Sequence, residues 1–555
     1  MNDRRPLLAI ALIMVIAFLP SIFLKKPAPP AVADSAAAPA TDSAVAPPLA
    51  APAPALAAGD TTAALPAASA IVDDTIEVRS PIYAYGISTR GGRIVSARFL
   101  EYRSLAEGEG RDTLELVPAA APLLDNRLIV AGDTVDFAAT GFTADAENLV
   151  VGEGETKTLT LTGTVRGLPA TLRYTFQHHD YRIDVAGTIG GLPVTGATLL
   201  LGMGDGFRQT EAVAAENLRE SGVVVKRDKS ELTRFGELEP DSTEVFGGPF
   251  EWAAVKNKYF VMGVFAYDSL RTDGPKGQIG SVIAAVRDTN ETVTRADVSA
   301  SLTVPTSGGF AATLYLGPME YDHLTAMGRD FDDVNPYGWP GFRTIIRPFA
   351  VGIRTVFVWM HESLGLAYGW VIVTFGVLIR LLLWPLNQKA MRSMTAMQAI
   401  QPELQRLQER YKQDPQKLQT EMFKLYKEHN VNPLGGCWPM LLPYPFLIAV
   451  FFVLANTIEL RGVGFLWMPD LARFDPLYII PVLMAGSMYL MTKIGQMGMP
   501  PNPQTKIMMY LMPAVFLLMF SKFASGLNLY YAVQNLAALP QQWLIMKERQ
   551  KLKKS

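Results

Sequence analysis

The sequence predicts a polytopic α-helical membrane protein that carries a large all-β domain outside the membrane. Two observations support this fold class. Apolar stretches of about 20 residues, the length needed to cross a bilayer, recur in the C-terminal third of the 555 residues. Residues 74–333 instead alternate apolar and polar side chains with period two, which is typical of antiparallel strands. The net charge of −2 hides a concentration of basic residues around the apolar C-terminal third.

The start of the chain is predicted to form a membrane anchor followed by a linker. Residues 1–26 contain an uncharged run, Leu7–Leu24, flanked by basic pairs. Its length favours an uncleaved transmembrane helix, and the cleavage-like Ala31-Val32-Ala33 lies well beyond it. The linker, residues 27–73, is rich in alanine and proline and has no aromatic residue. Such a segment cannot bury a core, so we expect an extended, partly polyproline tether.

The domain at residues 74–333 is predicted to be a sandwich of antiparallel strands. Leu172, Tyr174 and Phe176 alternate with smaller or polar residues, and glycines and prolines punctuate the pattern. His178-His179-Asp180 falls between two strand patterns, which favours a polar turn over a metal or catalytic site.

Residues 335–363 are predicted to lie flat on the membrane surface as an interfacial amphipathic segment. Arg343, Arg347 and Arg354 recur at helical spacing among apolar residues, as in helices that rest in the headgroup region. We expect Pro348 to kink or divide this helix.

The remaining membrane region, residues 364–546, contains four apolar stretches: Leu364–Leu386, Cys437–Ile458, Leu477–Thr492 and Ile507–Met546. The last is too long for one crossing. Residues Lys522 to Gly526 interrupt it, so we divide it into a helix that ends near Phe520 and another that begins near Leu527. Together with the anchor, these stretches give six crossings.

A charged insertion at residues 390–430 is predicted to form a helical hairpin. Apolar residues recur at threes and fours, and Asp414-Pro415 supplies an N-cap and a proline at the first helical position of the second helix. Eight Lys and Arg residues lie within 387–436, and residues 547–555 form a basic tail. The positive-inside rule places both segments and both termini in the cytoplasm, and residues 25–363 outside.

Arg380 stands almost alone as a charge in the Leu364–Leu386 stretch. An arginine near the centre of a membrane costs about 2.5–3.5 kcal/mol on insertion scales, so it is kept where it faces protein, water or a ligand. Because about 9 Å of helix separates it from Leu386, snorkelling to the cytoplasmic edge is an alternative. The sequence is therefore compatible with two interpretations of Arg380: a charge that faces a functional cavity, or a side chain that snorkels to the membrane surface.

Polar residues on other apolar helices could share a site with Arg380. Asn528, Tyr531 and Asn535 fall at i, i+3 and i+7, on one helical face. Gly376, one turn before Arg380, is expected to open space beside it, and Tyr444 could present a hydroxyl from another crossing. Either ordinary interhelical hydrogen bonding or a shared hydrated groove would explain this set.

No cofactor, metal or enzymatic chemistry is expected. A single cysteine, Cys437, and five scattered histidines leave too few ligands for a structural zinc site. A buried, inert thiol is the favoured reading of that cysteine. The membrane region shows no nucleophile–base pair or phosphate loop, and we expect no DNA partner.

Several motifs in residues 335–546 occur in the order typical of one known family. They include Asn432-Pro433-Leu434-Gly435-Gly436-Cys437, Arg380 with Trp384-Pro385-Leu386, Asp475-Pro476-Leu477-Tyr478-Ile479, and Ser525-Gly526-Leu527-Asn528-Leu529-Tyr530-Tyr531. With these motifs the chain resembles the YidC family of membrane-protein insertases. A looser resemblance covers residues 76–96, near the start of the periplasmic domain of Gram-negative members.

The resemblance implies a five-helix insertase core around a hydrophilic groove, with Arg380 as the positive residue inside it. It implies that Tyr444, Tyr530 and Tyr531 line the substrate path, and that the external domain is a periplasmic β-supersandwich similar to sugar mutarotases. Two positions depart from the family: Gly376 replaces a hydroxyl residue and Pro443 replaces a glutamine. We therefore expect a less polar groove, or one whose polarity comes from Asn528 and Asn535.

The function implied is that of an insertase and chaperone in the bacterial inner membrane, working alone or with the Sec translocon. Its implied partners are nascent membrane proteins, the lipid bilayer, the Sec translocon, and ribosomes that contact the basic tail and the hairpin. Two alternatives stay open: a secondary transporter, which would favour internal repeats with broken helices, and a membrane-anchored sugar-binding protein. The sequence shows no internal repeat of the kind a transporter would need. The histidines at 178, 179 and 323 are too scattered to support a sugar-binding or mutarotase-like site.

Overall fold

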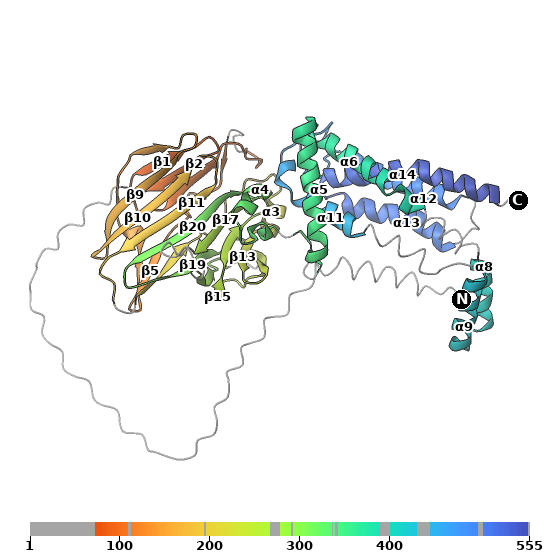
Figure 1. The fold of residues 1–555 in the computed structure, drawn as a ribbon, viewed down its shortest axis with the longest axis horizontal. Helices are drawn as coiled ribbons and strands as arrows, with labels where there is room; N and C mark the ends of the chain where they lie inside the picture. Colours follow the sequence, from red (N-terminus) through yellow and green to blue (C-terminus); the bar gives the residue numbers. More distant parts are fainter. Residues whose placement is uncertain are drawn as a thin grey trace, which may run out of the picture. The chain divides into compact units, whose positions relative to one another are not determined.

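The computed structural model describes residues 73–108, 113–193, 196–266, 278–289, 292–335, 337–338, 342–388, 400–429, 444–497 and 503–552. The predicted anchor, nearly all of the predicted linker, Cys437 and Pro443 lie outside these ranges. Within them, the chain forms a β-rich body followed by helices (Figure 1).

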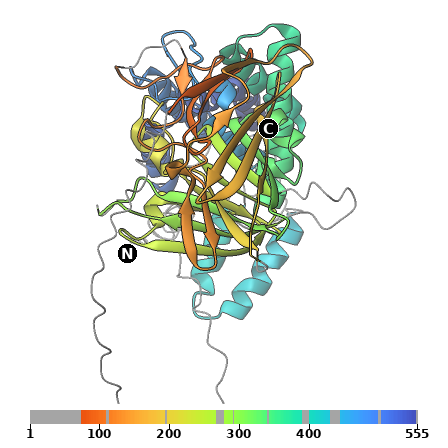
Figure 2. The ribbon, with the colours of Figure 1, turned by 90° about the vertical axis from the view of Figure 1, so that its left-hand side faces the viewer.

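The β-rich body contains three sheets (Figures 1 and 2). The first sheet has the order β4 (Leu114–Glu115), β3 (Ile94–Phe99), β2 (Tyr83–Ser88), β1 (Thr75–Arg79), β8 (Asn148–Val150). The second has the order β14 (Ser230–Arg234), β13 (Gly222–Lys226), β16 (Trp252–Lys256), β17 (Phe260–Ala266), β20 (Gly309–Pro318), β11 (Arg182–Ile189), β10 (Leu168–Gln177), β9 (Thr156–Val165), β7 (Thr143–Ala144). The third has the order β15 (Thr243–Phe250), β18 (Ile279–Ala285), β19 (Asp297–Val304), β12 (Ala197–Gly202), β5 (Arg127–Val130), β6 (Asp133–Asp136).

The period-two pattern seen in the sequence corresponds to strands β9, β10 and β11. They pair antiparallel, with Leu172 opposite Leu161 on one side and Tyr174 opposite Val185 on the other. Residues that alternate inward on one strand therefore meet inward residues on its neighbours. The predicted antiparallel strands are confirmed here, and His178 to Asp180 lie in the turn between β10 and β11.

Buried tyrosines join the first sheet to the second. The Tyr85 hydroxyl donates to the Leu316 carbonyl at 2.8 Å, and the Tyr83 hydroxyl donates to the Gln177 carbonyl at 2.7 Å. Each ring fills the apolar core while its hydroxyl is satisfied, as buried tyrosines require. The body also contains two short helices, α3 (Ala214–Glu220) and α4 (Tyr321–Ala326), so it is rich in β-sheet rather than strictly all-β.

Helix α5 (Arg343–Leu364) follows the β-rich body as one continuous helix. Pro348 lies within its first two turns and does not divide it. Its arginines contact protein: Arg343 donates to the Ser230 hydroxyl at 2.6 Å, and Arg347 pairs with Asp332 at 2.5 Å. The predicted amphipathic helix is therefore present, and these two basic side chains face carboxylate or hydroxyl partners.

The rest of the chain is helical. Its elements are α6 (Tyr368–Leu382), α8 (Gln401–Arg410), α9 (Pro415–Glu428), α11 (Tyr444–Asn456), α12 (Ile479–Gln496), α13 (Pro503–Phe520) and α14 (Ser525–Leu552). The predicted break between Phe520 and Leu527 is confirmed, because α13 ends and α14 begins there. The hairpin is present in its described part as α8 and α9, and the Asp414 side chain accepts from the Lys417 amide at 3.1 Å, as an N-cap does. In its described part, up to Leu552, the predicted basic tail is helical and continues α14.

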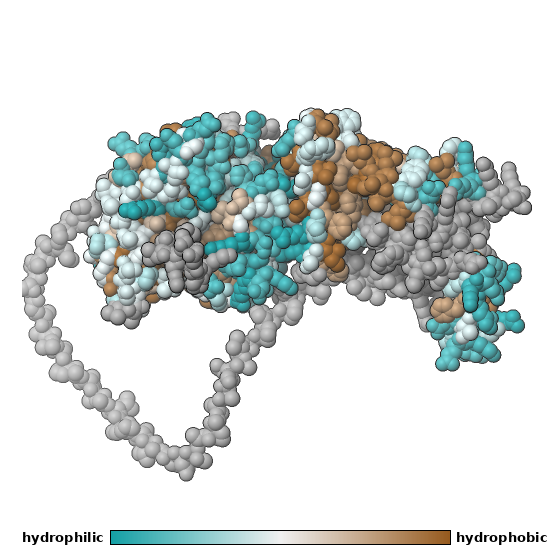
Figure 3. Space-filling model, viewed as in Figure 1, coloured by the Kyte–Doolittle hydropathy of each residue, from teal (hydrophilic) through white to brown (hydrophobic). Residues whose placement is uncertain are grey.

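The described helices differ from the predicted crossings in one respect. None of them combines the length and the apolarity needed to cross a bilayer. Large apolar side chains are nevertheless exposed along α6, and Figure 3 shows hydrophobic residues gathered over α5 and α6 while the β-rich body is largely hydrophilic on the same face.

Candidate functional site

Arg380 lies near the end of α6 and contacts α14 through an amide. Its Nη2 donates to Oε1 of Gln541 at 2.9 Å, and Gln541 is 1% exposed. The Arg380 Nε is buried and has no hydrogen-bond partner in the described part of the chain. No carboxylate pairs with Arg380 among the described residues, although other arginines of the molecule do have such partners. The positive charge is thus oriented without being neutralised.

A second glutamine continues this polar seam between α6 and α14. The Gln534 amide donates to the Gly376 carbonyl at 2.8 Å and to the Tyr530 hydroxyl at 3.2 Å. Gln541 likewise donates to the Trp384 carbonyl at 2.9 Å. Because Gln534 and Gln541 are seven residues apart, they lie on one face of α14. That face is the one that meets Arg380.

Gly376 permits close packing instead of opening space beside Arg380. A Cβ placed on Gly376 would lie 3.0 Å from Cγ1 of Val533 and 3.7 Å from the Tyr530 ring. The expectation of free space is therefore wrong, because the side chains of α14 occupy it. Small residues at such positions let helix backbones approach each other.

The predicted polar face at Asn528, Tyr531 and Asn535 does not meet Arg380 in the described residues. Asn528 is fully buried and donates to the Phe520 carbonyl at 3.0 Å, across the turn between α13 and α14. Asn535 donates to the Ser487 hydroxyl of α12 at 3.3 Å. The three residues share one face of α14, as their spacing predicts, but this face packs against α12 and α13. Of the two interpretations, interhelical hydrogen bonding fits these two asparagines better than a shared groove does.

The two tyrosines of α14 diverge. Tyr530 is fully buried and accepts the Gln534 amide, which places it beside Arg380's helix. Tyr531 packs its ring edge-on against Phe520, with ring centroids 5.7 Å apart. Tyr444 is the first residue of α11 and is 51% exposed. Tyr530 thus hydrogen-bonds within the Arg380 seam, Tyr531 contacts that seam only through the Tyr530 ring, with centroids 5.6 Å apart, and no hydrogen bond among the described residues links Tyr444 to it.

Gln534 and Gln541 are the residues that the sequence reasoning missed. Glutamine is common on exposed helices, so it attracted no attention beside asparagine and tyrosine. The available sign was their seven-residue spacing inside a long apolar stretch, where an uncharged polar residue needs a partner.

An arginine with a buried, charged partner lies in the connection between α11 and α12. The Nε of Arg461 donates to both carboxylate oxygens of Glu211, at 2.9 and 3.0 Å, and its Nη1 donates to the Arg103 carbonyl at 2.9 Å. The two charged side chains are 3% and 8% exposed. Arg354 of α5 forms a second ion pair, in which its Nε and Nη2 both donate to Oε1 of Glu459, at 2.7 and 2.5 Å. These contacts join the connection to α5 and to the β-rich body.

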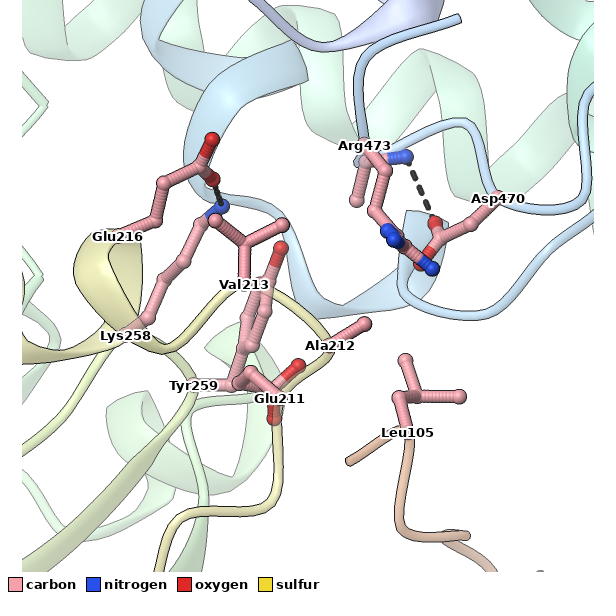
Figure 4. Close-up of a pocket in the computed structure, with 10 residues that line it drawn as sticks. Leu105, Glu211, Ala212, Val213, Glu216, Lys258, Tyr259, Asp470 and Arg473 are labelled. Atoms are coloured by element: carbon pink, nitrogen blue, oxygen red, sulfur yellow. Dashed lines mark hydrogen bonds and ion pairs between the residues drawn. The ribbon is translucent and has the colours of Figure 1, made fainter. Parts of the chain in front are cut away.

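A small pocket, lined in part by Glu211, adjoins the Arg461–Glu211 ion pair (Figure 4). Its volume is about 20 Å³, which is room for about one water molecule. Figure 4 shows the Lys258 ammonium directed at Glu216 on one side and Asp470 beside Arg473 on the other. Burial raises the pKa of Glu211 against the opposing effect of Arg461, and burial likewise raises the pKa of Asp470. The pocket is too small for an organic ligand.

The described residues contain no cluster of three or more histidine, cysteine, aspartate or glutamate side chains suited to a metal ion. A ring nitrogen of His178 lies 2.9 Å from the Val151 carbonyl, and His323 pairs with Glu320 at 3.5 Å. Both histidines have protein partners.

Comparison with known proteins gives consistent matches. The family described as "60Kd inner membrane protein" matches residues 359–553, and the "YidC periplasmic domain" matches residues 75–351. A protein from Maridesulfovibrio salexigens named membrane protein insertase YidC is 30% identical over 572 residues, covering 99% of each chain. One of the same name from Chlorobium phaeovibrioides is 32% identical over 440 residues, covering 74% of this chain and 73% of its own. A solved structure described as an active YidC insertase is 18% identical, covers 85% of this chain and 95% of its own, and has a TM-score of 0.34, too low to support an argument.

Proposed function

The chain belongs to the YidC family of membrane protein insertases, a family of bacterial inner-membrane proteins, and from this premise we propose that it inserts membrane proteins and assists their folding. The observation that carries the proposal is Arg380. Its guanidinium is held between α6 and α14 by a neutral amide, with no described carboxylate to neutralise it.

An uncompensated positive charge can lower the cost of moving a polar tail through an apolar region. Acidic groups of a substrate tail would be drawn to Arg380, and its unused N–H groups would donate to water or to the tail's carboxylates. Apolar side chains flank it on the exposed side of α6, namely Val377, Leu378, Leu381 and Leu382. An incoming hydrophobic helix can slide along these side chains into lipid. No nucleotide, metal or covalent step is required.

The same proposal includes the topology and partners predicted from the sequence. Residues 25–363 would face the periplasm, and the 390–430 hairpin, the 547–555 tail and both termini would face the cytoplasm. The groove around Arg380 would receive nascent chains, either directly or from the Sec translocon. Ribosomes would contact the basic residues of the hairpin and of the end of α14, where dense phosphate favours lysine and arginine.

Reconstitution with a minimal substrate tests this function. Liposomes containing only the purified protein are mixed with a short single-spanning substrate that has an acidic translocating tail. We expect the tail to become protected from external protease, and empty liposomes to protect little of it. Equal protection in both preparations would contradict an autonomous insertase. Protection that requires added Sec translocon would limit the proposal to the Sec-dependent pathway.

A further inference from the structure

Gln541 makes two polar contacts, one as acceptor and one as donor, which an ionised carboxylate could not make together. Its Oε1 accepts from Nη2 of Arg380, and its Nε2 donates to the Trp384 carbonyl, both at 2.9 Å. An amide has one accepting and one donating end, so these two contacts fix which end faces Arg380. A carboxylate at this position could bind Arg380 but could not donate to the Trp384 carbonyl.

The electrostatic consequence separates glutamine from glutamate. A carboxylate in the same place would form an ion pair with Arg380 in a buried setting, where opposite charges attract strongly. Glutamine accepts the same hydrogen bond and leaves the net charge of the pair at plus one. The Arg380 Nε is buried without a hydrogen-bond partner among the described residues, so part of the guanidinium's donor capacity is unused.

We propose that Gln541 is a positioning residue for Arg380, which holds the guanidinium in place while keeping its charge available to acidic groups of the substrate. The inference rests on the proposed insertase function and deepens it, because it assigns the preference for acidic tails to a residue that does not contact the substrate. Gln541 is 1% exposed, so it acts through Arg380 rather than directly.

The test compares two substitutions at this position with two substrates. Gln541→Glu keeps the shape and the bond to Arg380 but neutralises the charge, whereas Gln541→Leu keeps the charge and removes the hold. The substrates are the acidic-tailed single-spanning protein and the same protein with its tail Asp and Glu residues replaced by Asn and Gln. Gln542→Glu is the matched control, because it adds the same charge one residue further, beside Gly495 of α12.

We expect Gln541→Glu to lower insertion of the acidic-tailed substrate by about tenfold, the size of one lost charge-assisted contact, and to change the neutral-tailed substrate little. Gln541→Leu should also lower insertion of the acidic-tailed substrate, by a smaller factor, and should change the neutral-tailed substrate little. In an Arg380→Ala background, Gln541→Leu should have no further effect on the acidic-tailed substrate. Gln542→Glu should not discriminate between the two tails.

Each other outcome has a distinct meaning. The positioning role would be overturned if the Gln541→Glu variant inserted the acidic tail as well as wild type, or if it lost both substrates equally. A loss of both substrates together with a lowered melting temperature would assign Gln541 to helix packing alone and would also overturn it. If wild-type protein inserts neither substrate, the proposed function itself fails. If wild-type protein and Arg380→Ala insert the acidic tail equally, the role of Arg380 fails and the inference fails with it.

Discussion

Two arginines of the helical region have opposite kinds of partner. Arg461, in the connection between α11 and α12, binds both carboxylate oxygens of Glu211 and two backbone carbonyls. Arg380, on α6, binds the amide of Gln541 and leaves its Nε unused within the described residues. The first charge is neutralised where it is buried. The second is positioned and left uncompensated.

The difference teaches what each charge is for. A buried arginine that is paired with a carboxylate can join two elements while its charge is neutralised, and Arg354 with Glu459 repeats that arrangement. An arginine that is held only by an amide keeps its attraction for an anion, at a cost in desolvation. The connection beside the β-rich body therefore joins elements, whereas the α6–α14 seam is the place where we propose that substrate is attracted.

The largest expected effect is on stability, at the paired arginine. Glu211→Gln leaves the Arg461 charge buried without its partner and should lower the free energy of unfolding by about 3–5 kcal/mol. Chemical or thermal denaturation of the purified protein measures this loss. Glu155→Gln is the control, since Glu155 is an exposed partner of Lys157, and it should leave the transition unchanged. An equally small effect at both positions would contradict the neutralising role of Glu211.

The unpaired arginine should affect activity rather than stability. Arg380→Ala should lower insertion of an acidic-tailed substrate by about tenfold or more, the size of a lost charge-assisted contact. Arg380→Lys should retain substantial insertion, because no described carboxylate demands the bidentate geometry of a guanidinium. Insertion into liposomes at matched protein levels measures both. Full activity of the alanine variant would show that the charge is a snorkelling residue and not a functional one.

The pocket beside the paired arginine should make stability depend on pH. Burial raises the pKa of Asp470, so the folded protein retains a proton that the unfolded chain has already lost. The tighter proton binding of Asp470 in the folded state stabilises the protein fully below the unfolded pKa of about 4. This stabilisation is lost as pH rises through the higher folded pKa. Asp470→Asn should therefore flatten the pH dependence of the melting temperature above pH 4. An unchanged slope would exclude Asp470 as its source.

The smallest effect is expected from removing the β-rich body. Deleting most of residues 74–320 removes Glu211 and Arg103, but it also exposes Arg461 to water, which solvates the charge. Arg354 keeps Glu459. Insertion should stay within about twofold of wild type. The large energetic penalty comes from a charge that is buried without a partner, and Arg461 would be solvated instead of buried. Loss of insertion by a deletion variant that still folds would assign the body a direct role.

Several features followed from local patterns and needed no tertiary information. Alternation at Leu172 and Tyr174 predicted β10 and its neighbours, and Asp414-Pro415 predicted the start of α9. The interruption between Phe520 and Leu527 predicted the end of α13 and the start of α14. These predictions hold because period, capping and helix breaking act over a few residues. Arg380 stood out for the same reason, as a lone charge within one apolar stretch.

The sequence by itself determined the order of the elements, the β-rich and helical regions, and the residue at the centre of the candidate site. Only the tertiary structure decided which face of α14 meets Arg380, so it replaced Asn528 and Asn535 with Gln534 and Gln541. It also decided that Gly376 is filled by Val533. Spacing along a helix shows which residues share a face, but the partner of that face depends on helix rotation and packing, which are set by side chains far away in the sequence.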